Sequence, residues 1–375
     1  MQPEKIYLSP PHMGGSELKY IREAFDSNWI APVGLNISEF ENELEAYLQG
    51  VKGVALSSGT AAIHLALIQL GVKHGDSVIC QSNTHNASAN PITYLGANPI
   101  FIDSEPNTWN LDPELLEQAI KAEIIKGKKP KAIIVVHLYG MPALLSEILT
   151  IAQRYEIPVL EDAAEALGSQ INGKMCGTFG NFGVLSFNGN KIITTSGGGA
   201  LVCHSEQDKQ KTVFLSTQAR DHAPHYQHTE IGYNYRMSNV VAGIGRGQME
   251  VLSDRILQRR AHFNYYKEYL ADLPYLSFLD EPKTHYSNRW LTTILTPSFE
   301  MREQIRLALE AQNIESRPLW KPMHLQPVFA NNIAYTNGVS EDLFNRGLCL
   351  PSGSNLNKSQ LDSVVETIRG LRNEI

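Results

Sequence analysis

Short apolar runs alternate with longer segments of helical spacing from Val54 to Asp162, and this alternation restricts the fold more than any other feature of the chain. The apolar runs have the length of buried strands, whereas the segments between them have the apolar spacing of amphipathic helices. Such an alternation is typical of a mostly parallel sheet with helices on both faces, so we predict an α/β fold. The predicted strands are 54–58, 78–80, 99–103, 132–138 and 158–162, and the predicted helices between them are 61–70, 87–95, 113–126 and 144–155.

The second half of the chain indicates a smaller domain. Apolar runs at 183–187 and 199–203 extend the first domain, and a long helical pattern over 240–270 leads away from it. We predict a large domain with an N-terminal arm over residues 1–249 and a smaller C-terminal α+β domain over residues 250–375. Other expected elements are a helix at 38–48, a strand at 291–295 and helices at 302–312 and 358–371.

Charge and hydropathy exclude several classes of protein. The chain has 32 Lys and Arg residues against 39 Asp and Glu residues, a net charge of −7, and nucleic-acid binding needs a basic surface instead. No apolar run approaches the ~18 residues that span a bilayer, and residues 1–15 contain no apolar core of signal-peptide length. We therefore expect a cytoplasmic protein that binds neither nucleic acid nor membranes.

Metal ligands are not expected either. The four cysteines are scattered, without the spacing of a zinc site. His222, His225 and His228 are spaced by three, but Pro224 disfavours a helix there and no carboxylate completes a motif.

Three motifs lie where strands of this fold would end. Ser57-Ser58-Gly59-Thr60-Ala61-Ala62 joins a strand to a helix, so it is either an ordinary N-cap or an anion site at a helix N-terminus. Asp162 ends a buried strand, where a carboxylate either caps the next helix or serves as a functional acid. Lys191 lies among small, polar and glycine residues, and it is either solvated or tuned for Schiff-base chemistry.

Taken together, the three motifs fit pyridoxal 5'-phosphate (PLP). This cofactor needs an amine for its aldehyde, a carboxylate for its pyridinium nitrogen and an anion cradle for its phosphate. Lys191, Asp162 and Gly59-Thr60 supply these groups in one predicted domain. We predict PLP as the cofactor, with pyridoxamine phosphate as its intermediate form.

Five segments in the same order extend this pattern over nearly the whole chain. They are Ser57–Ala62, Glu161-Asp162-Ala163-Ala164-Glu165, Ser186-Phe187 with Lys191, Gly232–Met237 and Arg317–His324. In these segments the chain resembles the fold-type I, PLP-dependent sugar-nucleotide aminotransferases of the DegT/DnrJ/StrS type. The resemblance implies a large mixed, mostly parallel sheet between helices and a smaller C-terminal α+β domain.

The resemblance also implies roles for particular residues. Lys191 would form the Schiff base with the cofactor and Asp162 would pair with its ring nitrogen. The other implied cofactor contacts are Gly59, Thr60 and Ser186 at the phosphate, His85 stacked on the ring, Glu165 near the ring or the substrate, and Asn234 reaching the phosphate of the neighbouring subunit. An aromatic residue is usual at the stacking position, so His85 departs from the family pattern. Because Asn234 would reach the cofactor of the neighbouring subunit, a homodimer with shared active sites is expected.

The sugar site is expected in a loop and in the C-terminal domain. Trp29 and Ile30 lie in a segment that resembles the loop facing the sugar, although Trp29 could equally be a packing residue. His324 would approach the sugar or remain an ordinary loop histidine, and Arg236 would contact the substrate or brace a carboxylate. Asn188 and Arg317 complete the predicted substrate contacts.

The function implied by the resemblance is transamination. Glutamate would donate its amine to a nucleotide-linked 4-keto-6-deoxy sugar, and the motif wording is most similar to 4-aminotransferases acting on UDP-2-acetamido-4-keto-2,6-dideoxyglucose. The alternatives are a GDP-perosamine synthase and a dTDP-keto-sugar 3-aminotransferase. A PLP-dependent sugar dehydratase, in which a histidine replaces the lysine, or a PLP-binding regulator without turnover would be a different class.

Overall fold

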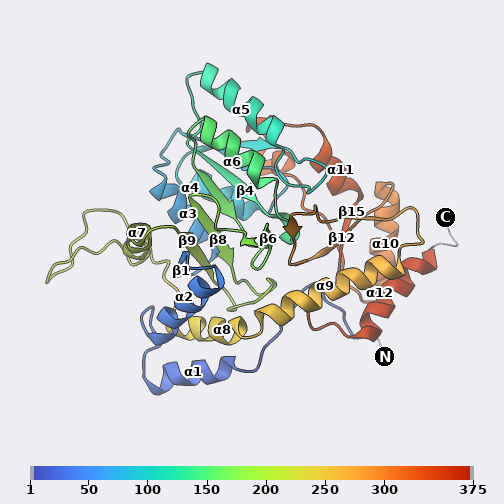
Figure 1. Ribbon diagram of the computed structural model, residues 1–375, viewed down its shortest axis with the longest axis horizontal. Coiled ribbons are helices and arrows are strands. Elements are labelled where there is room, and N and C mark those ends of the chain that lie inside the picture. The colour runs from blue at the N-terminus through green and yellow to red at the C-terminus, as the bar shows by residue number, and fades with distance from the viewer. Residues whose placement is uncertain (1–3, 372–375) are drawn as a thin grey trace.

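The computed structural model describes residues 4–371 and contains a large α/β unit and a smaller C-terminal unit (Figure 1). The large unit is built on an eight-stranded sheet with the order β1-β9-β8-β5-β4-β2-β3-β14. Its strands are β1 (Lys52–Leu56), β2 (Ser77–Gln81), β3 (Asn98–Ile102), β4 (Ala132–Val136), β5 (Val159–Asp162), β8 (Phe182–Ser186), β9 (Gly199–Cys203) and β14 (Ala334–Tyr335). The predicted α/β class with a mixed, mostly parallel sheet is confirmed.

β9 is the strand that makes the sheet mixed. Every neighbouring pair from β8 to β14 is parallel, whereas β9 is antiparallel to both β1 and β8. A parallel pair needs a crossover connection, usually a helix. Residues 187–198 instead form a loop that returns directly beside β8, and this loop carries Lys191.

Two separate apolar cores lie on the two faces of the sheet because successive strand side chains point to opposite faces. Ile133 and Val135 belong to one core, whereas Ala132 and Ile134 belong to the other. The first core includes residues of α2 (Leu35–Tyr47), α5 (Pro113–Ile125), α6 (Leu145–Arg154) and α8 (Asn239–Met249). The second includes residues of α3 (Gly59–Gln69), α4 (Asn90–Tyr94) and α7 (Glu206–Ser216).

The smaller unit packs helices against an antiparallel sheet of order β10-β12-β15-β13. Its elements are β10 (Ser277–Phe278), β12 (Thr292–Leu295), α10 (Phe299–Ala311), β13 (Arg317–Pro318), α11 (Val339–Arg346), β15 (Gly347–Leu350) and α12 (Lys358–Gly370). A third sheet of order β11-β6-β7 joins β11 (His285–Tyr286) to β6 (Gln170–Ile171) and β7 (Lys174–Met175). β11 and β14 come from the C-terminal part of the chain, and they pair with β6 and β3 of the large unit. Backbone hydrogen bonds therefore link the C-terminal part to the large unit.

The helix predicted over 240–270 is two helices, α8 and α9 (Leu252–Tyr269), which break at Glu250 and Val251 (Figure 1). α8 packs closely on α2 and on α1 (Glu17–Asp26), a helix that the sequence analysis did not predict. Tyr20 of α1 donates a hydrogen bond from its hydroxyl to Glu250 at 2.6 Å, which fixes α1 beside this break.

The segment predicted as one helix over 87–95 is also divided. It consists of a short 3₁₀ turn (Asn86–Ser88) followed by α4, which has Pro91 in its first turn. Proline lacks an N–H group, so it suits the start of a helix rather than its interior. None of the helices in residues 4–371 has the length and apolar character needed to cross a membrane.

Candidate active site

A cavity of about 360 Å³ lies at the carboxyl edge of the large sheet, where α/β proteins place their ligands. Side chains from both units line it, since Trp290 and Trp320 come from the C-terminal half of the chain. The predicted residues that line it are Gly59, Thr60, His85, Asp162, Glu165, Ser186, Asn188 and Lys191. Residues far apart in the sequence are thus brought into one cavity.

Lys191 presents its amine inside this cavity. Its side chain is 13% exposed, and its Nζ lies 3.6 Å from Glu165 Oε1. The ammonium also lies over the indole ring of Trp290, 4.3 Å from the ring centroid, which is the geometry of a cation–π contact. The Lys191 backbone N–H donates to the Asn188 carbonyl at 3.0 Å and closes the loop locally. Lys191 is therefore an oriented amine rather than a solvated one.

Asp162 is buried at the end of β5 and is oriented by hydroxyl groups. Its Oδ2 accepts a hydrogen bond from Ser88 Oγ at 2.6 Å, and its Oδ1 accepts one from the Ala164 N–H at 3.2 Å. Thr84 Oγ1 lies 2.7 Å from Ser88 Oγ. Because Ser88 gives its single proton to the carboxylate, Thr84 must be the donor in that pair. The sequence analysis missed Ser88 and Thr84.

Glu165 is a buried carboxyl group beside the lysine amine. Burial raises its pKa above the ordinary value, although nearby Lys191 and the Tyr139 N–H, which donates to Glu165 Oε2 at 2.7 Å, oppose the rise. A carboxyl group with a raised pKa takes up a proton more readily near neutral pH. Glu165 therefore combines a raised affinity for protons with a position beside the Lys191 amine.

His85 forms part of the cavity wall and is neutral. Partial burial lowers its pKa, and the charge of Lys191 lowers it further. Its Nδ1 accepts a hydrogen bond from the Ala87 N–H at 3.2 Å, so the proton of the neutral ring is on Nε2. The ring packs edge-on against Trp320, with 5.2 Å between ring centroids.

The N-terminus of α3 also lines the cavity. Ser58 caps the helix by accepting a hydrogen bond from the Ala61 N–H at 3.0 Å. Glycine is required at 199, because a Cβ there would lie 2.3 Å from the Gly59 nitrogen. The first N–H groups of a helix have no partner within the helix and favour anions. Ser57, Gly59, Thr60 and Ser186 thus surround a ready anion site.

Comparison with known proteins agrees with this geometry. The model of the DegT/DnrJ/EryC1/StrS aminotransferase family matches residues 11–369. The chain belongs to this family.

Similar proteins cover almost the full chain. EpsN of Bacillus subtilis (strain 168), named as an inferred pyridoxal phosphate-dependent aminotransferase, is 53% identical over 97% of this chain and 95% of its own. A GDP-perosamine synthase of Escherichia coli O157:H7 is 38% identical over 97% of both chains. Among solved structures, the chain is similar to the PLP form of Spr1654 from Streptococcus pneumoniae, which is described as a sugar aminotransferase by inference. The TM-score is 0.92 at 27% identity over 99% of each chain. As a family member, the protein is a PLP-dependent sugar-nucleotide aminotransferase.

The donor set of the cavity fits PLP. When bound, PLP supplies an aldehyde that condenses with amines and a ring that withdraws electrons from the bond being broken. Lys191 provides the amine, and Asp162 provides a carboxylate that already holds two hydrogen bonds on its two oxygens. Gly59 and Thr60 line the cavity at the N-terminus of α3, where the free N–H groups of a helix favour a phosphate.

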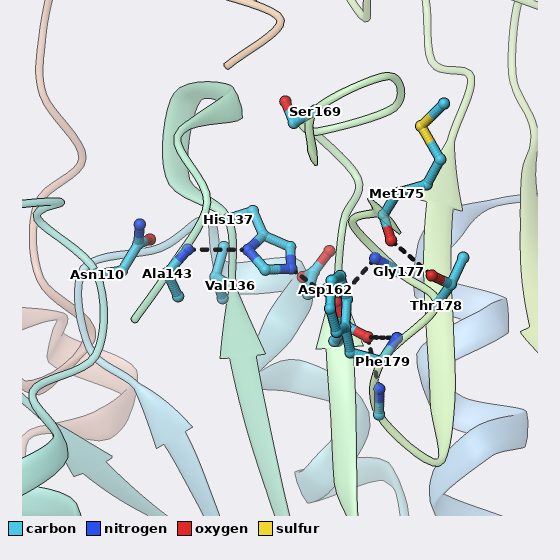
Figure 2. Close-up of polar contacts among 12 residues, drawn as sticks. Asn110, Val136, His137, Ala143, Asp162, Ser169, Met175, Gly177, Thr178 and Phe179 are labelled. Atoms are coloured by element: carbon cyan, nitrogen blue, oxygen red, sulfur yellow. Dashed lines mark hydrogen bonds and ion pairs between the residues drawn. The ribbon is translucent and has the colours of Figure 1, made fainter. Parts of the chain in front are cut away.

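A buried network on the other face of β5 holds Asp162 in place (Figure 2). Glu161 accepts hydrogen bonds from the N–H groups of Gly177, Phe179 and Gly180 at 2.8, 2.5 and 2.6 Å, and from His137 Nε2 at 2.9 Å. Burial opposes ionisation of Glu161, but these donors lower its pKa below the ordinary value. Since Glu161 precedes Asp162, the network fixes the end of the strand that carries it.

The same network defines the state of His137. Its Nδ1 accepts a hydrogen bond from the Ala143 N–H at 3.1 Å, so Nε2 carries the proton that is donated to Glu161 (Figure 2). The sequence analysis missed this network, because its partners come from three separate segments.

Six predicted residues do not line the cavity: Trp29, Ile30, Asn234, Arg236, Arg317 and His324. Trp29 and Ile30 are 56% and 49% exposed, and Asn234 is also exposed. The Arg236 guanidinium pairs with Glu41 at 2.5 Å, a contact that agrees with the interpretation of Arg236 as a brace for a carboxylate. The assigned cofactor and substrate roles of these residues stay predictions.

Arg317 and His324 lie next to the cavity. Arg317 is largely exposed, pairs with Glu315 at 2.8 Å and lines a neighbouring cleft that shares Trp290 and Trp320 with the cavity. His324 bonds Ser82 Oγ through Nδ1 at 2.7 Å and Glu341 through Nε2 at 3.2 Å. His324 therefore has two partners within the protein.

The His-rich segment holds no candidate metal site. His228 donates from Nδ1 to the Gln218 carbonyl at 2.9 Å. Within residues 4–371, no group of three or more His, Cys, Asp or Glu side chains could hold a metal ion.

Proposed function

We propose that this family member transfers an amino group from L-glutamate to C4 of a nucleotide-linked 4-keto-6-deoxy sugar, with UDP-2-acetamido-4-keto-2,6-dideoxyglucose as the preferred acceptor. The observation that carries the reaction type is the single cavity holding the Lys191 amine, the Asp162 carboxylate and the N-terminus of α3. Support for the acceptor comes from the amino-acid sequences around Lys191 and over Arg317–His324, which resemble those of 4-aminotransferases that act on it.

The residues of the cavity divide the work of proton transfer. Lys191 Nζ removes the proton from Cα of glutamate and later delivers a proton to the sugar carbon that receives the amine. With PLP bound, Asp162 would hold a proton at the cofactor nitrogen, where the ring would supply its electron-withdrawing character. Glu165, 3.6 Å from Lys191 Nζ, takes up or returns a proton as the charge of the amine changes. The ring of Trp290 keeps the ammonium oriented toward the cavity.

A second acceptor is GDP-4-keto-6-deoxymannose, and a specific observation favours it. The GDP-perosamine synthase of E. coli O157:H7 is 38% identical to this chain over nearly its full length. Amination at C3 of a dTDP-keto sugar is a third candidate reaction. A sugar dehydratase is disfavoured because position 191 holds lysine rather than histidine.

The proposed assembly is a homodimer in which each site contains residues of both subunits. Asn234 is exposed and lies outside its own cavity, as a residue that serves the neighbouring subunit would. Tyr226 and Ile231, on the same segment, are 79% and 83% exposed, and such apolar side chains suit an interface with a second copy. Cytoplasmic location remains part of this proposal.

The proposed function is tested with purified protein and a panel of UDP-, GDP- and dTDP-linked keto sugars, with glutamate as donor. We expect 2-oxoglutarate and an amino sugar to form fastest with the UDP-linked acceptor, and borohydride to fix the cofactor on Lys191. Faster turnover of the GDP-linked sugar would assign the second acceptor. Attachment of the cofactor to another lysine would refute the proposed site.

A further inference from the structure

Arg259 is a buried cation without an acidic partner. Its side chain is only 1% exposed and lies in the middle of α9, the helix that joins the two units (Figure 1). Burial, together with the nearby charge of Arg255, lowers its pKa to about 9, so it is still protonated at neutral pH. Among residues 4–371, its hydrogen bonds go to a carbonyl and a hydroxyl, and no carboxylate contributes to its pKa. A charge buried in this way costs stability, and an apolar side chain of similar size would avoid that cost.

The hydrogen bonds of Arg259 run to two other segments of the chain. Its Nη1 donates to the Trp290 carbonyl at 2.6 Å, just before β12. Its Nη2 donates to Ser9 Oγ at 3.0 Å, in the N-terminal arm. One guanidinium thus ties the arm and the C-terminal unit to α9.

Both of these partners converge on one carbonyl group beside the catalytic lysine. Ser9 Oγ and Trp290 Nε1 each donate a hydrogen bond to the Asn190 carbonyl, both at 2.7 Å. The two lone pairs of that carbonyl are therefore used. The Trp290 ring lies 4.3 Å from Lys191 Nζ, so the same residue contacts the lysine through its side chain. A chain of contacts therefore runs from Arg259 to the backbone of Asn190 and to the indole that lies over Lys191.

We infer that Arg259 is a positioning residue for Lys191: it holds Ser9 and Trp290 against Asn190 so that the amine points into the cavity. The inference rests on the proposed role of Lys191. It explains why a charge that costs stability is placed at this point: a guanidinium reaches two acceptors in fixed directions, which an apolar side chain cannot do. A displacement of about 1 Å at a reacting group can lower a rate about 100-fold, so modest loosening of the loop is measurable.

The test compares Arg259→Met with Arg255→Met in the full-length chain freed of cofactor. Arg255 lies one turn earlier on α9 and also holds the arm, donating to the Met13 carbonyl at 2.9 Å, but it bonds neither Ser9 nor Trp290. PLP is added, and borohydride traps at intervals give the rate of attachment to Lys191. Hydrogen exchange of the peptide covering 188–193 and the urea midpoint of unfolding are measured on the same samples.

For Arg259→Met we expect attachment to be about tenfold slower and exchange to be faster in residues 188–193 alone. The urea midpoint should be unchanged or higher, and Arg255→Met should attach PLP at the wild-type rate. Attachment at the wild-type rate by Arg259→Met, or an equal slowing by Arg255→Met, overturns the inference. If wild-type protein attaches no PLP to Lys191, the proposed function fails instead, so the two failures are distinct.

If Arg259→Met does not fold, Ser9→Ala takes its place. This variant keeps the buried cation but removes one donor to the Asn190 carbonyl. Slower attachment with an unchanged urea midpoint supports the inference, and an unchanged rate of attachment overturns it.

Discussion

Asp162 owes its orientation to the Ser88 hydroxyl and the Ala164 N–H rather than to a charged partner. A hydroxyl donor stabilises the carboxylate without competing with the cofactor for its charge, whereas an ion pair would neutralise it. The relay from Thr84 through Ser88 to Oδ2 and the Ala164 N–H at Oδ1 each use only part of the acceptor capacity of the carboxylate, which lines the cavity. Loss of the Ser88 hydroxyl should therefore weaken the function of Asp162 less than loss of the Asp162 carboxylate itself.

Substitutions along this relay should lower turnover to different extents. We expect Asp162→Asn to abolish nearly all turnover with the fold intact, because an amide cannot stabilise a pyridinium charge. Ser88→Ala should lower kcat about tenfold, the effect of losing one hydrogen bond to a charged group. Steady-state transfer from glutamate measures both variants, and circular dichroism checks their folding. Near-normal activity of Asp162→Asn would mean that another acid supports the ring nitrogen.

The raised pKa of Glu165 predicts a pH dependence of stability. A carboxyl group with a pKa raised by folding binds more protons in the folded state, so it stabilises less as the pH rises from its unfolded value near 4.5 toward the folded value. Glu165→Gln lacks this dependence. The free energy of unfolding of the Gln variant, relative to that of wild type, should therefore increase across this window and then level off. Urea unfolding of cofactor-free protein from pH 4 to 7 measures the difference, and a decrease with rising pH would contradict the assignment.

Among the helices, α8 depends on glycine for its packing. A Cβ on Gly247 would lie 2.6 Å from the backbone nitrogen of Glu17 in α1, and one on Gly245 would lie 2.7 Å from the Phe40 ring in α2. The three helices can approach closely only because these positions have no side chain. This contact holds the N-terminal segment, and through it the arm that carries Ser9, against the large unit.

Alanine substitutions at a closely packed and at an open helix glycine should differ in their effect on stability. Gly247→Ala should lower the free energy of unfolding by about 1–3 kcal/mol, because the added methyl group meets backbone that cannot move. Gly370→Ala, in α12, meets no atom within 4 Å and should be neutral or stabilise by up to about 1 kcal/mol through helix propensity. Chemical denaturation of both variants makes the comparison. Equal effects of the two substitutions would show that close packing is not the cause.

The sequence predicts an element correctly where neighbouring residues in the chain determine that element. The end of β5 at Asp162 and the start of α3 near Gly59 follow from apolar runs and cap residues, and the structure has both. The break between α8 and α9 and the closely packed α1 depend on contacts between helices, which no local pattern contains. Trp290 and Trp320 line the cavity because the C-terminal unit folds back onto the sheet, although both residues are far from Lys191 in the sequence. The ion pair of Arg236 likewise depends on the position of Glu41, which is distant in the sequence.

At the scale of the whole molecule, the cavity is completed by distant parts of the chain. Lys191, Asp162 and the N-terminus of α3 come from the large unit, the tryptophans come from the smaller unit, and the arm supports the lysine loop through Ser9. The proposed dimer adds a residue of a second chain to the same site. Each active site would then fail if any one of these contributors were lost.

Mixed dimers test the shared site directly. In the proposed dimer Asn234 of one subunit binds the phosphate of the other subunit's cofactor, so cofactor and dimer should stabilise each other by mass action. Lys191→Ala and Asn234→Ala chains should each be severely impaired alone. A heterodimer of the two contains one site with Lys191 from one chain and Asn234 from the other, so about half of the sites in heterodimers are intact. Mixing the variants should restore transfer from glutamate, and mass spectrometry of differently tagged chains verifies that subunits exchange. If exchange is seen and no activity returns, each subunit builds its site alone and Asn234 serves its own chain or none.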